Sequence, residues 1–551
     1  MTALASREGD VFARPIRPGM RVAAVVTCSA IAYYFSLETL VGGWRYQTPL
    51  ADLALVPFLA ALLLVAAYRR HPHVVDLRLA RIDVILASFC ILVALALLVA
   101  GPVIWSKYFW ATRLDLLTLP LFVSAGVMLL FGTRALIRFG FALTFLLLVW
   151  PLPYHALIER TLGFFTAITT WTATTLAGPL GLAQADPATE GLFMVEHEGE
   201  QFSVLVGSAC SGVNTLVRFL VVGIFGLYFV RGTAGRRLLW LVLGAALVWS
   251  FNVVRILGIL AVGKSYGERA AFEVLHPVAG LLALNAAALV LVLLMRPFGL
   301  RWRRAVEVDS PLAVPGEPHE RATPTRFLRR FALLAFATVV IALANGTLRD
   351  AARGLTNDGR PAVAPFTASP VVGSGWQAEP LETIGWATPY YGKHSSWVRY
   401  RVRPASANGA AFTIWLDAVR SPDLGALNAY TLAHCYDFHD FDVNLARRVD
   451  LSDGVIGQAF VYDTPRATWH VVSWQWPVLL EDGRTEHERI VMLASAESSP
   501  ETVEGGSGGV RDWLLSLLDL RAPSEDDNPE LTKALTAVAT AAVRERVRGP
   551  A

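Results

Sequence analysis

Long apolar runs dominate the chain between residues 20 and 345, and they recur at the length of a membrane-crossing helix. A bilayer core needs about 20 predominantly apolar residues per helical span. Short polar loops separate the runs, so the pattern predicts a polytopic α-helical membrane protein with about eight or nine spans. The expected spans are 22–42, 51–68, 83–104, 114–132, 137–152, 212–230, 238–262, 277–295 and 327–345.

Arginine residues are concentrated in alternate loops between these runs. Cytoplasmic loops of membrane proteins are enriched in Lys and Arg, so the arginine-rich loops and the N-terminus are expected in the cytoplasm. The chain should then leave its last span on the extracytoplasmic side. The arginine-rich loops lie at 69–81, 134–138, 231–237 and 296–304.

Residues 155–182 form an apolar but threonine-rich segment whose placement is ambiguous. If this segment crossed the bilayer, the arginine-rich loop at 231–237 would lie outside, against the charge bias. We therefore expect a helix that lies at the outer interface or dips into it. Residues 192–206 then form an extracytoplasmic hairpin that turns at 198–199 and carries the chain to Cys210.

Beyond residue 346 the pattern changes to short runs rich in aromatic and β-branched residues, separated by Gly, Pro, Asn and Asp. Runs at 397–402, 411–416 and 469–474 are typical of strands, which predicts a soluble extracytoplasmic α+β domain. The expected organisation is a multi-span membrane domain at 1–300, a polar cytoplasmic linker at 301–326, a final transmembrane helix at 327–346, the soluble domain at 347–520 and a charged tail at 521–551.

Composition agrees with a membrane protein and excludes other classes. The 551 residues are 54% hydrophobic and only 17% charged, which is too apolar for one soluble domain. The net charge of +3 is small and the arginines lie in short loops, so no nucleic-acid partner is expected. The cysteines form no CxxC pair, so no disulfide framework, metal site or cofactor is expected; they are Cys28, Cys90, Cys210 and Cys435. The first apolar run lacks an Ala-x-Ala exit, so no cleavable leader is expected.

Three polar residues fall at one membrane face in this topology. Cys210 lies at the start of a span, Arg255 in the outer half of the span 238–262, and His276 just before the span 277–295. Ionisable groups at the edge of hydrocarbon are costly, so each is a functional hypothesis. A thiol that attacks a carbonyl, an imidazole that transfers protons and a guanidinium that stabilises an oxyanion together make a cysteine acyl-transfer site.

Each of these residues also has a structural interpretation. Cysteine is often a small buried residue of apolar helices, which we expect for Cys28 and Cys90. Cys210 differs because unpaired N–H groups at a helix start lower the pKa of a nearby thiol. Arg255 could extend to the outer lipid headgroups, and His276 could cap a helix ahead of a proline.

Four further residues are expected to support the site. Ser211 and Gly212 flank the thiol, and Asn252 shares a helix face with Arg255, which it could orient. Arg218 lies two turns beyond the thiol on nearly the same face. It could bind a substrate carboxylate or tune the thiol, but a structural pairing inside the helix bundle is the favoured interpretation.

The strings Ala209-Cys210-Ser211-Gly212 and Asn252-Val253-Val254-Arg255, followed by His276, resemble the exosortase/archaeosortase family over roughly residues 50–297. The resemblance implies a membrane transpeptidase that cleaves C-terminal sorting signals of exported proteins, such as PEP-CTERM types. It implies Cys210 as the nucleophile, Arg255 as a stabiliser of the oxyanion or thiolate, and His276 as the acid/base. It also implies a bacterial inner-membrane location.

The soluble segment resembles the exosortase-associated domain, through His434-Cys435, Val443 and the tryptophan-rich region 469–476. A metal or second thiol site remains an alternative there, although a strand-and-turn segment with a buried cysteine is favoured. The residues in question are His434, Cys435, Asp437, His439 and Asp440.

The sequence thus favours a cysteine transpeptidase or protease that acts at the extracytoplasmic face. Its partners would be exported proteins whose C-terminal sorting signal is a short motif followed by a membrane helix. The acyl acceptor would be a group on a membrane lipid or surface glycan, or water. The alternative is a non-enzymatic membrane component or a transporter for envelope polysaccharide export. A transporter should have repeated halves with broken helices, and no such repeat is visible.

Overall fold

The computed structural model forms two compact units. The first comprises Met1–Ser29, Asp52–Leu92 and Leu119–Thr338, and the second comprises Ala30–Ala51, Val93–Thr118 and Val339–Ala551. Up to residue 355 the structure describes 18–48, 50–70, 80–105, 109–186, 191–206, 212–303 and 324–355. Beyond it, the structure describes 357–495 and 528–548. Within 357–495 it leaves out 358, 369, 371, 374, 386–387, 406–411, 430–441, 444–446 and 464–466.

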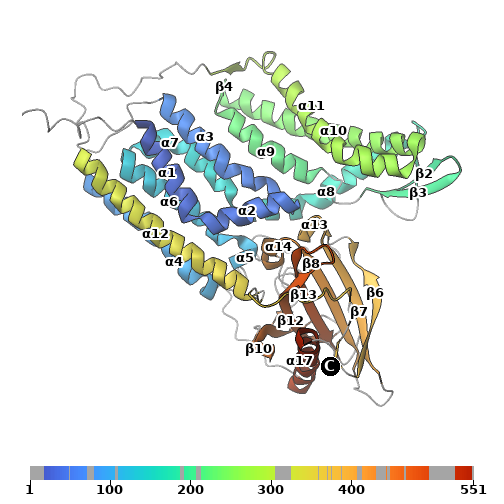
Figure 1. The fold of residues 1–551 in the computed structure, drawn as a ribbon. Coiled ribbons are helices and arrows are strands. Elements are labelled where there is room, and N and C mark those ends of the chain that lie inside the picture. The colour runs from blue at the N-terminus through green and yellow to red at the C-terminus, as the bar shows by residue number, and fades with distance from the viewer. Residues whose placement is uncertain are drawn as a thin grey trace, which may run out of the picture. The chain divides into compact units, whose positions relative to one another are not determined.

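Most of the described chain before residue 356 is helical (Figure 1). Their bounds are α1 (Pro18–Ala32), α2 (Tyr34–Tyr46), η1 (Ala51–Ala54), α3 (Leu55–Arg70), α4 (Ala80–Ile104), α5 (Phe109–Thr112), α6 (Leu114–Phe131), α7 (Ala135–Leu146), η2 (Leu147–Val149), α8 (Leu152–Ala177), α9 (Val213–Leu227), α10 (Ala234–Arg269), the π-helix η4 (Ala270–Leu275), α11 (His276–Leu293) and α12 (Pro324–Leu355).

Five helices in the described part of the chain are long and apolar enough to cross a membrane, or six if α1 and α2 form one broken span. The chain is therefore a helical membrane protein, but eight or nine full-length spans are not established. Three expected spans coincide with shorter apolar helices, at Ala135–Val149, Thr215–Leu227 and Val278–Leu293. At 1.5 Å per residue such helices fall short of a core about 30 Å thick. Helix α8 is not among the span candidates.

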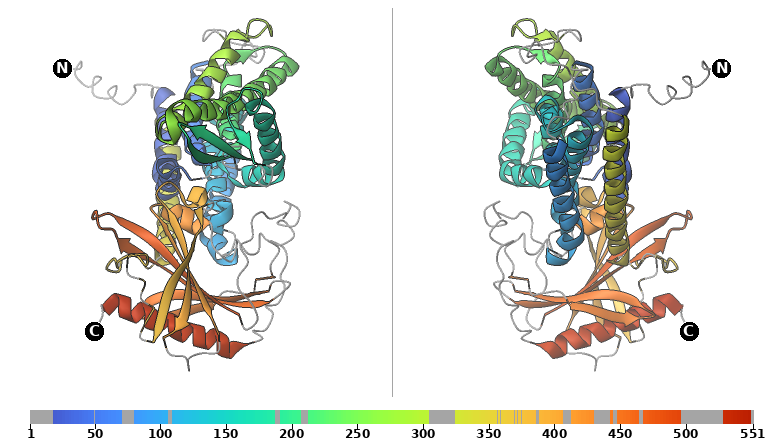
Figure 2. Two further views of the ribbon diagram at one scale, coloured as in Figure 1. Left: turned by 90° about the vertical axis from the view of Figure 1, so that its right-hand side faces the viewer. Right: turned by 90° about the vertical axis from the view of Figure 1, so that its left-hand side faces the viewer.

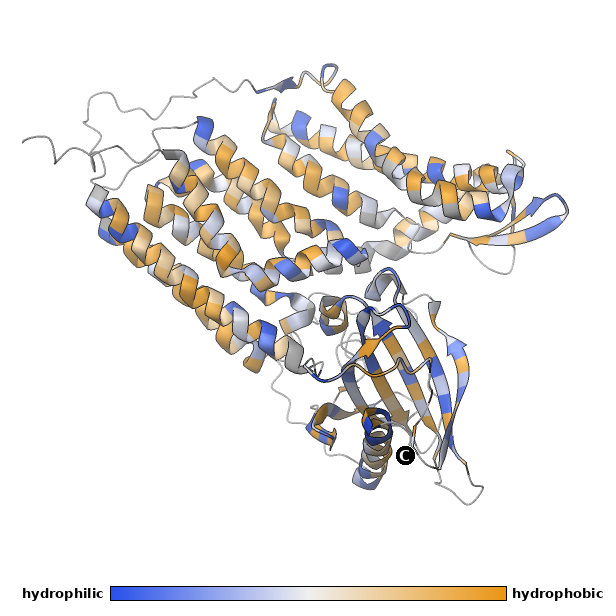
Figure 3. Cartoon of the chain, viewed as in Figure 1, coloured by the Kyte–Doolittle hydropathy of each residue, from blue (hydrophilic) through white to orange (hydrophobic). Residues whose placement is uncertain are grey.

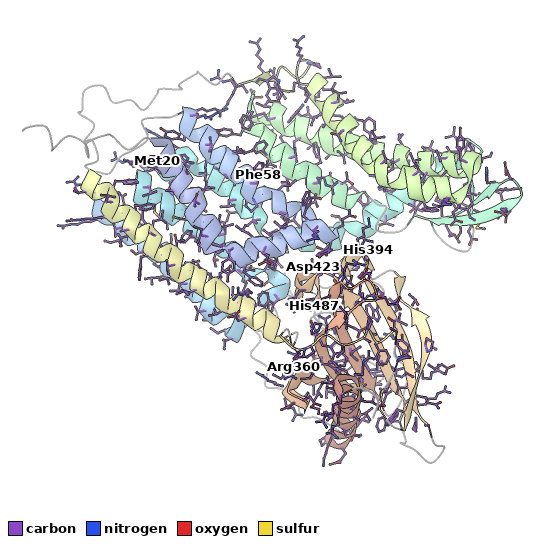
Figure 4. The ribbon with its side chains drawn as sticks, viewed as in Figure 1. Met20, Phe58, Arg360, His394, Asp423 and His487 are labelled. Atoms are coloured by element: carbon purple, nitrogen blue, oxygen red, sulfur yellow. The ribbon has the colours of Figure 1, made fainter. Side chains whose placement is uncertain are left out.

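The outward faces of these helices are apolar. Figure 3 shows mostly apolar residues on the visible sides of these helices. Met20 on α1 and Phe58 on α3, labelled in Figure 4, are 57% and 63% exposed. Helices that are apolar on all sides suit a lipid environment, because the surface that faces away from the protein also avoids water.

The expected span 22–42 is not one helix. It breaks at Tyr33 into α1 and α2, which are bent by 80°. A break leaves the first N–H groups of the second helix without helical partners. The buried Asn345 of α12 satisfies them, because its Oδ1 accepts from the N–H groups of Phe35 (2.8 Å) and Ser36 (3.2 Å). The expected span is thus at best a broken one, and the local sequence does not show the break because Asn345 lies more than 300 residues away.

A buried network of charged side chains binds the C-terminal end of α6. Arg330 of α12 pairs with Asp83 of α4 at 3.2 Å. The other oxygen of Asp83 accepts from the backbone N–H and the hydroxyl of Thr133, at 2.8 and 2.7 Å. Arg330 and Arg21 also donate to the last carbonyls of α6, those of Leu129 and Leu130. These arginines therefore have structural partners in addition to any role in topology.

The hairpin expected at 192–206 is confirmed. Strand β2 (Leu192–His197) pairs antiparallel with β3 (Glu200–Leu205), and β1 (Gln184–Ala185) pairs with the other side of β2. Glu198 and Gly199 both have positive φ, 51° and 87°, as a two-residue turn of this hand requires.

A second small sheet joins two loops. Strand β4 (Val230–Arg231) pairs with β5 (Arg301–Trp302), so the start of the expected linker 301–326 is structured. Residues 304–323 of that linker lie outside the described residues.

The C-terminal region folds as an eight-stranded antiparallel sheet with the order β10-β11-β12-β13-β8-β7-β6, in which β9 pairs with β11. The strands expected at 397–402 and 469–474 lie in β7 and β12, and the run at 411–416 overlaps β8. The bounds are β6 (Trp376–Thr383), α13 (Thr388–Tyr391), β7 (Ser396–Pro404), β8 (Ile414–Ser421), α14 (Leu424–Ala429), β9 (Asp442–Val443), β10 (Arg447–Ser452), β11 (Val455–Asp463), β12 (Thr468–Leu479), β13 (Thr485–Ala494) and α17 (Pro529–Arg548).

Helix α17 lies across one face of this sheet (Figure 2). It falls within the segment expected as a charged tail, yet its apolar side chains enter the core between helix and sheet. Their spacing of three and four residues defines one helix face, which is why they can all be buried together. The six are Leu531, Leu535, Val538, Ala539, Ala542 and Val543.

Two acidic residues are buried in this domain with different partners. Burial raises the pKa of the Glu488 carboxyl, which accepts hydrogen bonds from the Phe366 N–H (2.9 Å) and the Trp476 indole (3.3 Å). Asp417 on β8 instead faces Arg399 on β7 across the ladder, in a bidentate pair at 2.7 and 2.8 Å. Its exposed fraction is 1%.

We expect Asp417→Ala to lower the free energy of unfolding of the sheet domain by about 3–5 kcal/mol, because it leaves the buried Arg399 charge without this partner. The measurement is tryptophan fluorescence during urea unfolding of the full chain in detergent. Asp482→Ala is the matched control, since Asp482 pairs with Arg484 in an exposed turn at 2.7 Å and should leave the unfolding midpoint unchanged. Equal midpoints for the two variants would contradict the prediction.

Candidate active site on helices α9, α10 and α11

Helices α9, α10 and α11 pack as an antiparallel group in which α10 is central. Side chains of α9 and α11 meet over Gly244 of α10, where an added Cβ would lie 2.3 Å from the Phe219 ring and 2.9 Å from Leu291. Lower on α10, the Trp240 indole donates to the Leu291 carbonyl at 2.9 Å. Large side chains of α9 and α11 therefore occupy the space above Gly244, which fixes the register of all three helices.

Gly212 ends the loop that follows the hairpin and caps α9. Its φ and ψ are 84° and 0°, a left-handed conformation that favours glycine. An added Cβ would lie 2.9 Å from the Nδ2 atom of Asn252 on α10. Asn252 is buried, with 3% of its surface exposed. Glycine is thus required at position 212 both by the backbone conformation and by the close approach of Asn252.

Arg255 lies one turn beyond Asn252 on α10 and approaches α11. Its guanidinium carbon is 3.9 Å from the position of a Cβ at Gly280. Gly280 follows His276 by one helical turn, so the two positions share a face of α11. The Arg255 side chain is half-buried. Helix α10 therefore contacts, one turn apart, the start of α9 and the first turns of α11.

His276 is the first residue of α11, and Pro277 follows it in the first turn, where proline is tolerated. The π-helix η4 ends immediately before it. Single π turns are rare and frequently occur at functional sites. The His276 side chain lies outside the described side chains. Cys210 and Ser211 also lie outside the described residues, so their positions follow only from their covalent neighbours.

The hairpin is fixed to α8 and α10 beside this site. Its inward side chains form a buried cluster with α8 and α10; the cluster comprises Ala173, Ala177, Phe193, Val195, Val204, Val206, Ile256 and Leu260. The Trp249 indole also donates to the Thr169 hydroxyl at 3.0 Å, which ties α8 to α10. Near the turn, the His197 ring bonds the Lys264 carbonyl at 2.8 Å.

Arg218 has a structural partner. Its Nε lies 2.8 Å from a carboxylate oxygen of Asp52 in the short helix η1. Asp52 is buried, and such a charge is retained inside apolar surroundings when it is paired. This contact agrees with the favoured interpretation of Arg218 as a structural residue of the bundle.

Among the described residues, the other cysteines and the acidic residues form no second site. Cys28 is buried and Cys90 is half-buried, and both are free thiols. No group of three or more His, Cys, Asp or Glu residues with a metal-binding arrangement occurs among the described residues. The alternative site from His434 to Asp440 lies outside those residues.

Sequence reasoning missed Gly280, Asp52 and η4. Gly280 carried a weak signal, a residue without a side chain one turn after His276 in a helix rich in Leu and Ala. Asp52 carried another, an acid next to a long apolar run. The π-helix carried none, because its sequence Ala-Ala-Phe-Glu-Val-Leu is compatible with an ordinary helix.

Comparison with known proteins identifies the membrane part. No curated protein and no solved structure matches the chain. Residues 44–294 match the family described as transmembrane exosortase (Exosortase_EpsH). The match includes α9, α10 and the whole of α11. The membrane part of this chain belongs to the transmembrane exosortase family.

Proposed function

We propose that the protein is a membrane cysteine transpeptidase or protease that cleaves the C-terminal sorting signal of exported proteins through a thioester intermediate. One observation carries the proposal beyond family membership. Helix α10 packs Asn252 against Gly212, two residues after Cys210, and Arg255 against Gly280, one turn after His276. The neighbours of all three candidate catalytic residues therefore meet around one stretch of α10.

Covalent geometry limits how far Cys210 and His276 can lie from this stretch of α10. Two residues of chain span at most about 7 Å, so the Cys210 Cα lies within that distance of the Gly212 Cα. One helical turn rises about 5.4 Å, which separates His276 from Gly280 along α11. Both distances are comparable to the length of the Arg255 side chain. The geometry thus supports a site in which Arg255 reaches between a thiol and an imidazole.

The chemistry follows from these residue types. The Cys210 thiolate attacks the carbonyl carbon of the scissile peptide, and the electron pair of the C=O bond moves to oxygen. Arg255 stabilises this oxyanion. His276 as imidazolium gives its proton to the leaving amine as the C–N bond breaks, which leaves a thioester. Neutral His276 then takes a proton from the incoming acceptor, which attacks the thioester and releases the thiolate.

The substrate in this proposal is an exported protein held in the membrane by a C-terminal helix behind a short motif. The acceptor is an amine or other nucleophile on a lipid or surface glycan, or water. The site and the sheet domain lie on the extracytoplasmic side of the bacterial inner membrane. The arginine-rich loop between α9 and α10 supports this orientation, because it puts the opposite ends of both helices outside.

Replacing the nucleophile should abolish activity without affecting insertion. We expect Cys210→Ala to stop processing of a co-expressed exported protein with a C-terminal helix and arginine tail, while the variant accumulates normally. Cys210→Ser should retain almost no activity, since a hydroxyl is a far weaker nucleophile at neutral pH. Immunoblotting of the substrate's size measures the outcome. Full processing by Cys210→Ala would end the enzyme proposal.

The position of the Arg255 guanidinium should depend on the size of the side chain at residue 280. We expect Gly280→Leu to displace the guanidinium and lower the processing rate at least tenfold, whereas Gly280→Ala should be tolerated because the added Cβ lies at an ordinary contact distance. Arg255→Lys should be severely impaired, since it keeps the charge but loses the planar fork. Quantified processing rates at matched protein levels measure the effect. A fully active Gly280→Leu variant would separate Arg255 from the site.

Orientation can be measured independently of activity. We expect single cysteines at residue 195 and in the sheet domain to react with a membrane-impermeant thiol reagent in spheroplasts. Cysteines at residues 235 and 310 should react only after permeabilisation. Residue 235 is the matched control for residue 195, because α9 lies between them in the chain and crosses the membrane in the proposed topology. A cytoplasmic residue 195 would contradict the proposed orientation.

A further inference from the structure

Strand β3 has an open edge beside the candidate site. It is the last strand in the order β1-β2-β3, and in the part of the chain that the structure describes it pairs only with β2. The bond from the Val206 N–H to the Gly191 carbonyl, 2.8 Å long, fixes which residues face β2. Hydrogen bonds to one neighbour alternate along an antiparallel strand. Gln201, Ser203 and Leu205 therefore direct their backbone N–H and C=O groups away from β2.

This edge lacks the proline, lysine and irregular pairing that often protect one, and its one charged residue, Glu200, lies at the turn end of the strand. The strand sequence Glu-Gln-Phe-Ser-Val-Leu contains neither proline nor lysine, and the side chains of Gln201 and Ser203 are exposed. Strand β6, an edge of the C-terminal sheet, is protected by contrast: it contains Pro380, and its pairing is irregular between Pro380 and Glu382. Natural proteins use proline, charge and irregularity to keep exposed edges from pairing with another chain. The same chain thus protects one edge and leaves the other open.

The open edge is held rigidly and leads to the candidate nucleophile. Phe202 packs so closely on Gly263 of α10 that an added Cβ there would lie 2.8 Å from the ring. The hairpin is therefore fixed against the helix that carries Arg255. Four residues lie between Leu205 and Cys210, so five residue steps separate the two Cα atoms, and they span at most about 18 Å. An extended chain paired with β3 would need only a few further residues to reach the thiol.

We propose that β3 binds the substrate polypeptide by strand addition and delivers the scissile peptide to Cys210, an inference that rests on the proposed function. The occupant is the extended segment that immediately precedes the substrate's membrane helix. Backbone pairing supplies affinity for any extended chain, so this edge binds the segment without selecting its motif. The segment must reach the thiol with its C-terminal end. It therefore runs parallel to β3, which itself runs toward Cys210.

Proline substitution tests the edge without disturbing the hairpin. Ser203→Pro removes one outward N–H group and leaves the β2–β3 ladder intact, because proline is tolerated where the N–H faces away from the sheet. We expect it to lower the processing rate of the co-expressed helix-and-arginine-tail protein about tenfold, with unchanged thiol labelling of Cys210. Ser203→Ala keeps the N–H group and should process at the wild-type rate. A wild-type rate for Ser203→Pro would overturn the proposal.

Cross-linking tests substrate binding at the same edge in a variant that does not process the substrate. In the Cys210→Ala background, a photoreactive benzophenone side chain at position 203 should form an adduct with the same helix-and-arginine-tail protein. The same group at position 382, on the protected edge of β6, should form none. No adduct at 203, or equal adducts at both positions, would overturn strand addition. If Cys210→Ala still processes the substrate, the proposed function fails. The cross-linking result does not depend on catalysis and therefore still decides whether the substrate binds at the β3 edge.

Discussion

The arrangement of α9, α10 and α11 depends on close packing at two glycines: Asn252 of α10 approaches Gly212 at the start of α9, and side chains of α9 and α11 meet over Gly244 of α10. Neither glycine leaves room for an added Cβ without a shift of its neighbours, so two residues without side chains determine how near α9 and α11 come to α10. Because the three helices are antiparallel, this spacing brings the start of α9 and the start of α11 to the same level. Packing at glycine positions is the usual way in which membrane helices approach closely.

Lipid imposes a second constraint, which is that polar groups need partners inside the protein. Asn345 supplies acceptors where α1 and α2 separate, Asp83 pairs with Arg330, and Asp52 pairs with Arg218. Each partner is distant in sequence. The same constraint explains why Asp83 of α4 and Arg330 of α12 can be structural although the neighbouring turns of both helices are largely apolar.

These two constraints also separate what the sequence predicts from what it does not. Apolar runs, the Glu198–Gly199 turn and the alternating strands are local signals, and the corresponding helices, hairpin and sheet strands are present. The break at Tyr33 depends on Asn345, and the buried face of α17 depends on the sheet beneath it, so neither is visible locally. For the candidate site, residue types and topology suggested Arg255 and Asn252. Their contacts with Gly280 and Gly212 required the register of three helices.

The length of α10 has a consequence for where a substrate is cut. At 1.5 Å per residue the helix carries Arg255 about 28 Å from Arg236, close to the thickness of the hydrocarbon layer. Its remaining turns, with the hairpin attached, then project past that layer. Such a helix holds its outer end at a fixed distance from the hydrocarbon layer. In the proposed reaction it would fix the height of the cut above the bilayer, so the distance between a substrate's motif and its own helix would become part of what the protein selects.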